Sequence, residues 1–227
     1  MINSWLARKS GVTSRSMQWP GYIAYNNREC VIEPLNLIPM YLNQHEIRSL
    51  IDKSFDNFVD FVNTLPDIRF TASPYGKWSA GQQLDHLTKS IRPISSALAF
   101  PKITLRYFGT AVMPSRSYEA LVADYQRVLA GSFKAARAYQ PGVIYPAQRP
   151  ALLQGFLLQK NKILNKLSGW SEKDLDKYRL PHPLLGKVTI REMLYFIAYH
   201  NEHHLEKLKD QELQGHTWQN QLQQLIF

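Results

Sequence analysis

Two histidines near the C-terminus, His200 and His204, have the spacing with which one helix can present two nitrogen ligands to a single metal ion. Residues 184–208 around them show the apolar periodicity of an amphipathic helix. At about 100° of rotation per residue, His204 falls inside the apolar stripe, His200 at its edge, and His203 roughly 125° from its centre. We therefore expect His200 and His204 to face a bundle interior and His203 to face outward.

The histidine pair alone leaves two interpretations open. The first is part of a metal site, and the second is a pair of core histidines that are hydrogen-bonded to polar neighbours. A third ligand from another element would favour the metal site, because protein metal sites of this kind use at least three side-chain ligands.

The other periodic segments predict the helices that must position this pair. Apolar residues recur at three- and four-residue steps, and Pro or Gly ends most of the runs. Ser79 is the expected N-cap of the second helix, and Thr189, with Glu192 three residues on, is the expected cap of the last. The helices expected before the last one span residues 41–64, 80–99, 117–139 and 150–168.

Three polar residues outside the pair have positions that bear on a site. His86, in the second helix, lies roughly 115° from the centre of the apolar stripe, so periodicity places it on a flank. Asn161 falls on the apolar face of its helix, and we favour a side chain satisfied by a neighbouring carbonyl over a site role. Residues 170–187 are expected to form a loop, with His182 as a loop residue between two prolines rather than a ligand.

The composition predicts one globular domain in the cytoplasm. The 227 residues are 44% hydrophobic and 12% aromatic, which suffices for a full-sized core. No run approaches the roughly 18 apolar residues of a membrane span, so we expect no membrane partner. The net charge of +9 is scattered, which argues against a nucleic-acid partner. The single cysteine, Cys30, excludes an internal disulfide and fits a reducing compartment.

Residues 1–39 differ from the rest of the chain in composition. They hold several Pro, Gly and Ser residues and show no sustained apolar period. They also lack the compact apolar stretch and small-residue cleavage site of a secretory signal. We expect an irregular N-terminal arm at 1–39 and one helical domain at 40–227.

Two motifs together resemble those of the DinB/YfiT-like superfamily of four-helix-bundle metalloproteins. Residues 78–87, WSAGQQLDHL, resemble the family's second-helix motif, and residues 189–204 resemble its closing helix, which ends in HxxxH. The resemblance covers about residues 40–210 and implies an all-α, up-and-down four-helix bundle. The predicted helix 117–139 and the arm are additions to that pattern. The resemblance further implies that His86, His200 and His204 hold one divalent metal ion.

The resemblance also implies metal-dependent chemistry on a small molecule. Some relatives are S-transferases that activate a low-molecular-weight thiol as a metal-bound thiolate, and others are metal-dependent hydrolases. Zinc, nickel, iron and manganese all suit histidine nitrogens, and the sequence does not decide among them. Glu202 and Tyr199 flank the ligands and, with Asn161, are the candidates for proton transfer.

A non-enzymatic bundle is the competing hypothesis. Such a protein would bind a metal or a partner without turnover, for example as a stress-response accessory. A homodimer is compatible with either hypothesis. Metal content, and the response of the melting temperature to His200→Ala, distinguishes a metal site from a pair of core histidines.

Overall fold

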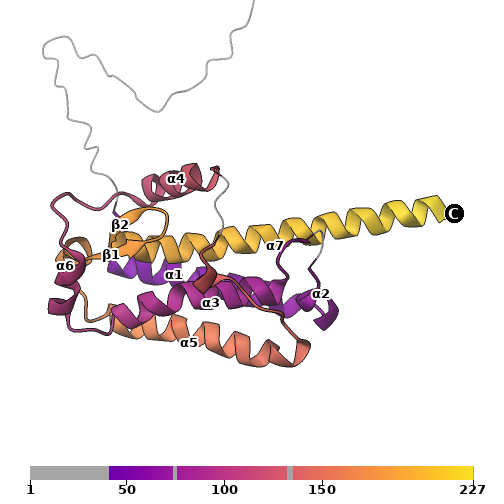
Figure 1. The fold of residues 1–227 in the computed structure, drawn as a ribbon, viewed down its shortest axis with the longest axis horizontal. Helices are drawn as coiled ribbons and strands as arrows, with labels where there is room; N and C mark the ends of the chain where they lie inside the picture. Colours follow the sequence, from indigo (N-terminus) through magenta and orange to yellow (C-terminus); the bar gives the residue numbers. More distant parts are fainter. Residues whose placement is uncertain (1–40, 74–75, 132–134, 227) are drawn as a thin grey trace, which may run out of the picture. The chain divides into compact units, whose positions relative to one another are not determined.

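The computed structural model describes residues 41–73, 76–131 and 135–226, with side chains up to Gln214. Four long helices pack lengthwise as a bundle (Figure 1). They are α1 (Gln44–Thr64), α3 (Ala80–Ala97), α5 (Arg149–Leu167) and α7 (Ile190–Ile226). Both α1 and α3 pack against α5 and α7. The predicted all-α four-helix bundle is confirmed, whereas the predicted arm at residues 1–39 lies outside the described residues.

Shorter elements connect the four helices. The short helices are α2 (Asp67–Thr71), η2 (Lys102–Phe108), α4 (Tyr118–Leu129), η3 (Arg137–Tyr139), η4 (Pro146–Gln148) and α6 (Glu172–Lys177). The strands β1 (Arg179–His182) and β2 (Gly186–Thr189) form one antiparallel hairpin. Among the described helices, none combines the length and the apolar character that a membrane crossing requires.

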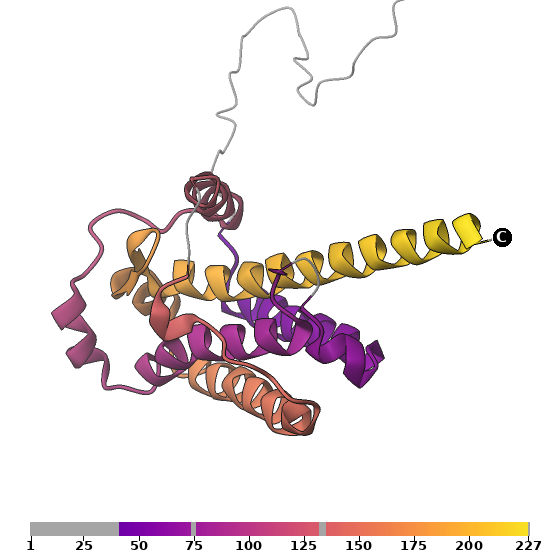
Figure 2. The ribbon, with the colours of Figure 1, turned by 45° about the vertical axis from the view of Figure 1, so that its right-hand side comes forward.

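The helices α1 and α7 run in the same direction. The Tyr195 hydroxyl, near the start of α7, donates to the Leu42 carbonyl just before α1, at 3.3 Å. Further along both helices, the Asn201 amide donates to the Ser54 hydroxyl, also at 3.3 Å. The same end of each helix therefore lies at the same end of the bundle, as both views show (Figures 1 and 2).

The helices α3 and α5 are parallel to each other and antiparallel to that pair. Thr88 lies beside Gly155, and the Ser95 hydroxyl donates to the Gln159 side-chain oxygen at 2.6 Å. These directions refine the expected up-and-down order, because two consecutive long helices run the same way. Residues 98–148 between them are long enough to carry the chain back along the bundle.

The starts of α3 and α7 are fixed by reciprocal capping, as the sequence predicts. The Ser79 hydroxyl accepts from the Gln82 amide, and the Gln82 side chain accepts from the Ser79 amide. Thr189 and Glu192 exchange the same two bonds, at 3.2 and 3.0 Å. Each box satisfies two backbone donors that have no partner inside the helix, and so sets where these two helices begin.

Two sequence predictions about the connections are wrong. The helix expected over 117–139 ends at Leu129, where the Gly131 amide bonds back to the Val128 carbonyl and closes the last turn. The loop expected over 170–187 instead contains α6 and the hairpin, whereas the start of α7 at Ile190 agrees with the predicted cap at Thr189. The hairpin turns at Gly186, whose φ of 70° favours glycine.

The placement predicted for Asn161 is also wrong, since its side chain is exposed on α5. The buried face of α5 includes two polar residues that a hydrophobic pattern cannot find. Lys160 is buried through ion pairs with Asp52 and Asp56, both at 2.6 Å. Gln159 is buried through its hydrogen bond with Ser95, so polar partners add to the apolar side chains that orient this helix.

Phe156 on α5 provides a test of the core. Its ring is fully buried and stacks on Phe55 of α1 at 4.3 Å. We expect Phe156→Ala to lower the free energy of unfolding by about 3–5 kcal/mol, because the change opens a cavity. Urea unfolding measures this loss. Leu158→Ala, at a position 48% exposed on the same helix, is the matched control, and a similar loss there would contradict the core assignment.

Candidate metal centre

Three histidine rings meet between α3 and α7, in the interior of the bundle. The Nε2 atoms of His86 and His200 lie 3.3 Å apart, and those of His204 and His200 lie 3.2 Å apart. One ligand atom from each ring lies within 4.8 Å of the other two. The three side chains are only 6%, 4% and 5% exposed. The two residues of the predicted pair therefore face inward together, and His86 of the antiparallel helix meets them.

Fixed hydrogen bonds orient two of the rings. The Nδ1 atom of His86 lies 2.7 Å from the Tyr139 carbonyl oxygen, and Nδ1 of His204 lies 2.9 Å from the Gln83 side-chain oxygen. The Gln83 nitrogen donates to the Trp78 carbonyl at 3.3 Å, which assigns its oxygen as the acceptor. Both histidines therefore carry their proton on Nδ1, and each turns an Nε2 lone pair toward the cluster.

The third ring, His200, is held by aromatic packing. Its Nδ1 is buried without a hydrogen-bond partner among the described residues. The ring stacks on Phe196 at 4.8 Å, and the edge of His182 meets Phe196 at 4.2 Å. His182 is itself fixed, because its Nδ1 accepts from the Leu184 and Leu185 amides, both at 3.1 Å. The hairpin tip thus supports His200 through one phenylalanine.

The donor set fits a divalent metal ion. Neutral nitrogens that face each other at 3.2–3.3 Å repel unless a proton or a cation lies between them. Two imidazoles that bind zinc tetrahedrally at 2.0–2.1 Å have nitrogens roughly 3.3 Å apart. Burial, the largest effect, lowers the pKa of all three histidines and so favours the neutral form that binds metal. Three nitrogen ligands also leave positions for other ligands.

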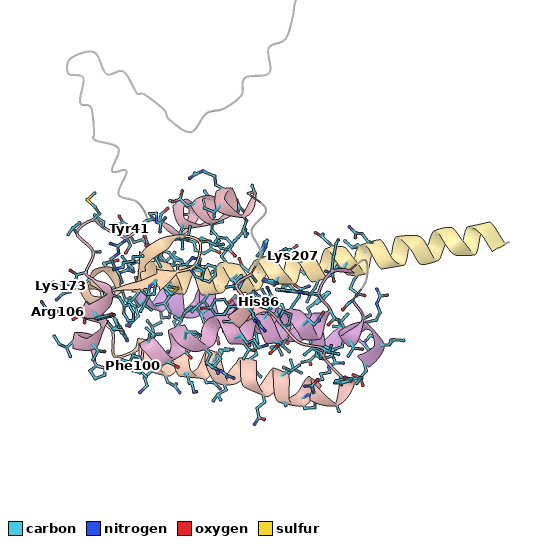
Figure 3. All side chains as sticks on the ribbon, viewed as in Figure 1. Tyr41, His86, Phe100, Arg106, Lys173 and Lys207 are labelled. Atoms are coloured by element: carbon cyan, nitrogen blue, oxygen red, sulfur yellow. The ribbon has the colours of Figure 1, made fainter. Side chains whose placement is uncertain are left out.

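A cavity of about 790 Å³ opens beside the three histidines. Its walls come from α3 and α7, from α4 and residues 135–141, and from the hairpin tip. Trp78 lies against His86 with ring centroids 4.9 Å apart and also lines the cavity. This volume suits a small organic molecule. Figure 3 shows His86 amid the side chains that fill the middle of the bundle.

The residues predicted for proton transfer lie away from this cavity. Glu202 accepts from the Tyr118 hydroxyl at 3.2 Å, and the Tyr199 hydroxyl accepts from the Gln126 amide at 2.8 Å, so both face α4. Neither lines the cavity, and Asn161 is exposed on α5. The structure therefore brings none of these three candidates to the histidine cluster.

Two histidines that the sequence assigned elsewhere do line the cavity. His203, expected to face outward, is half-buried and stacks on Tyr199 at 6.0 Å. His182, expected in a loop, is buried at the end of β1. Both predictions are wrong because α4 and the hairpin cover this side of α7, and single-helix periodicity does not account for such covering elements.

Gln83 and Tyr139 are contributors that sequence reasoning missed. Gln83 precedes His86 by three residues, so it lies on the same helix face, and this spacing was a usable signal. Tyr139 contributes only its carbonyl oxygen, which no side-chain pattern can reveal.

The fold and the site together define a helix-bundle protein with a three-histidine cluster suited to a divalent metal ion. The family model of the DinB superfamily matches residues 50–208, which is most of the chain. The chain therefore belongs to the DinB superfamily. No curated protein matches it.

Gln83 provides a test of how the cluster is oriented. Gln83→Leu removes the acceptor of His204, and we expect metal affinity to fall roughly 10- to 100-fold, as with other supporting residues of metal sites. Gln83→Glu keeps an acceptor and should retain the affinity. Competition with a chromophoric chelator measures both variants, with circular dichroism as the check on folding. Equal affinity of the leucine and glutamate variants would contradict this role.

The hairpin histidine provides a pH test on metal-free protein. Burial, followed by the charge of Arg116, lowers the pKa of His182 to about 4. Between pH 6.5 and 4 the unfolded chain therefore binds a proton here that the folded chain does not, so stability falls as the pH falls. His182 alone should contribute roughly 3 kcal/mol to this loss.

Urea unfolding at pH 7.5 and 4.5, with a chelator present, measures the effect. His182→Asn supplies an oxygen that can accept the two turn amides but cannot titrate. Its stability should therefore fall less across this interval than that of the wild type. An unchanged difference between the two pH values would show that His182 does not titrate as described.

Proposed function

We propose that this protein is a metal-dependent enzyme acting on a small molecule, with His86, His200 and His204 as the metal ligands. The observation that supports this proposal most directly is the convergence of three buried Nε2 atoms beside a cavity of about 790 Å³. When bound, a divalent ion would lower the pKa of a thiol or of water and so supply a nucleophile near neutral pH.

The chain's own groups would prepare the site for this chemistry. The Tyr139 carbonyl and Gln83 hold two imidazoles in the ligand tautomer, and Phe196 holds the third ring. Burial keeps all three neutral and limits the entry of water. Two of the three ring pairs already have the nitrogen separation of a zinc site, which favours binding.

Between the two chemistries, transfer of a low-molecular-weight thiol is favoured over hydrolysis. Deprotonating water requires a larger pKa shift than deprotonating a thiol, and an enzymatic hydrolysis usually adds a general base. Among the described residues that line the cavity, Asp210 is the only carboxylate, and it lies about 9 Å further along α7 than His204 at 1.5 Å per residue, so the candidate base near the cluster is His203, whose ring centroid lies 5.5 Å from that of His204. Thiol transfer depends less on such a base. Metal identity, a homodimer and a cytoplasmic location stay predictions.

Elemental analysis of the purified protein is the first test. We expect about one divalent ion per wild-type chain, and a loss of at least tenfold in metal content for His200→Ala, because two nitrogens no longer form the site. His203→Ala is the matched control: it removes a neighbouring histidine outside the cluster and should keep the metal. No stoichiometric metal in the wild type, or unchanged metal in His200→Ala, would contradict the proposal.

Metal-loaded protein is then assayed with small thiols, such as cysteine and glutathione, and an alkylating electrophile. Consumption of thiol above the uncatalysed rate, absent in His200→Ala, is the expected result. Ester or amide hydrolysis in the same preparation would instead support the second chemistry. Retained metal without either turnover would favour a binding protein.

A further inference from the structure

We propose that the cavity binds an elongated organic anion, with its apolar part on the hairpin side of the histidines and its anionic group near Lys207. This inference takes the cavity to be the substrate site of the proposed function. It rests on the distribution of side chains along the cavity.

The cavity changes character from one side of the histidine cluster to the other. Toward the hairpin most of its lining side chains are apolar, among them Pro93 and Ile94 of α3, Leu184 of the turn, and Met193 and Phe196 of α7, whereas Ser90 and His182 are polar. Toward the opposite end of the bundle the lining side chains are polar: Lys77, Gln83, Lys207, Asp210, Gln211 and Gln214.

The two regions are separated along the axis of α7. Phe196 precedes the histidine pair and Lys207 follows it, eleven residues later, which corresponds to about 16 Å at 1.5 Å per residue. A ligand that contacts both regions must therefore be elongated, and it must pass the histidine cluster. A compact ion would leave the apolar region without a partner.

The polar region carries a net positive charge. Lys207 has no ion pair among the described residues, whereas Lys209 next to it is paired with Glu206 at 2.8 Å. The Lys77 ammonium contacts the neutral side-chain oxygen of Gln214 at 3.4 Å. Against these two ammonium groups stands one carboxylate, that of Asp210. Figure 3 labels Lys207 on α7 and His86 on α3, the helices that border this region. The charge balance favours an anionic group of the ligand.

The apolar region favours a hydrocarbon portion of the ligand. Met193 and Phe196 are 2% and 8% exposed, and α4 and the hairpin supply the facing side chains. Burial of each additional methylene group in such surroundings strengthens binding roughly fourfold. An alkyl anion should therefore bind more tightly than either its head group or its hydrocarbon chain alone.

Calorimetric titration of metal-loaded protein tests the inference with 1-octanesulfonate, whose sulfonate is a weak metal ligand. We expect it to bind at least tenfold more tightly than methanesulfonate and than 1-octanol. The affinities of butanesulfonate and hexanesulfonate should lie between those of methanesulfonate and octanesulfonate, in order of chain length. Equal affinity for methanesulfonate and octanesulfonate, or no binding of octanesulfonate, would overturn the inference.

Two lysine variants locate the anionic group. Lys207→Gln should weaken octanesulfonate binding about tenfold, which corresponds to the loss of one charge-assisted hydrogen bond, and should leave octanol binding unchanged. Lys209→Gln removes an equal charge from the same helix outside the cavity. It should change neither the affinity for octanesulfonate nor that for octanol. Unaltered octanesulfonate binding by Lys207→Gln would overturn the placement.

Metal content, measured on the same samples, separates this inference from the proposed function. Octanesulfonate binding that depends on Lys207 in a protein without metal would support the inference and contradict the proposed function. Full metal content without octanesulfonate binding would contradict the inference and support the proposed function.

Discussion

The meeting of α3 and α7 at three buried imidazoles is the contact on which the candidate site depends. Neutral nitrogen atoms at 3.2–3.3 Å tolerate little change in the register of either helix, because a shift of one residue moves a side chain by about 100° around its axis. The capping boxes at Ser79 and Thr189 fix where each helix begins. The cluster therefore relies on backbone hydrogen bonds at the ends of both helices as well as on its own contacts.

A network of ion pairs, each between a buried and a more exposed group, fixes the first turn of α7. Arg191 is 3% exposed and pairs with Asp176 and Glu172 at 2.6 and 2.7 Å. Glu192 pairs with Arg116 at 2.9 Å, which ties α7 to the segment before α4. Arg191 and Glu192 are the buried members of these pairs, and a buried charge left without its partner is costly. These pairs therefore specify the rotation of α7, and with it the direction in which His200 and His204 point.

The sequence predicted the long helices and the histidine pair because both follow from one-helix geometry, whereas the four-helix arrangement followed from the resemblance to a family. His86 shows where such geometry fails. Periodicity placed it on a flank, yet it is buried, because α3 packs against both α5 and α7 and so buries more than one stripe. Only the resemblance to a family predicted that His86 lies beside His200 and His204. His203 and His182 were misplaced for a related reason, since the elements that cover them come from other parts of the chain. Polar partners that bury Lys160 gave no signal in a hydrophobic pattern.

The connection between α3 and α5 links the cluster to the cavity. The Tyr139 carbonyl, which orients His86, belongs to the same segment as Ala136 and Pro141, which form part of the cavity wall. Any ligand that fixes the His86 ring in its Nδ1–H tautomer also favours the position of this carbonyl, because the two groups share one hydrogen bond. The same segment is also bound to α3 by the Lys89 ammonium, which donates to the Gln140 carbonyl at 3.0 Å, and by the Gln82 side-chain amide, which donates to the Gly142 carbonyl at 3.1 Å. Three hydrogen bonds from α3 therefore hold this part of the cavity wall in register with the histidine cluster.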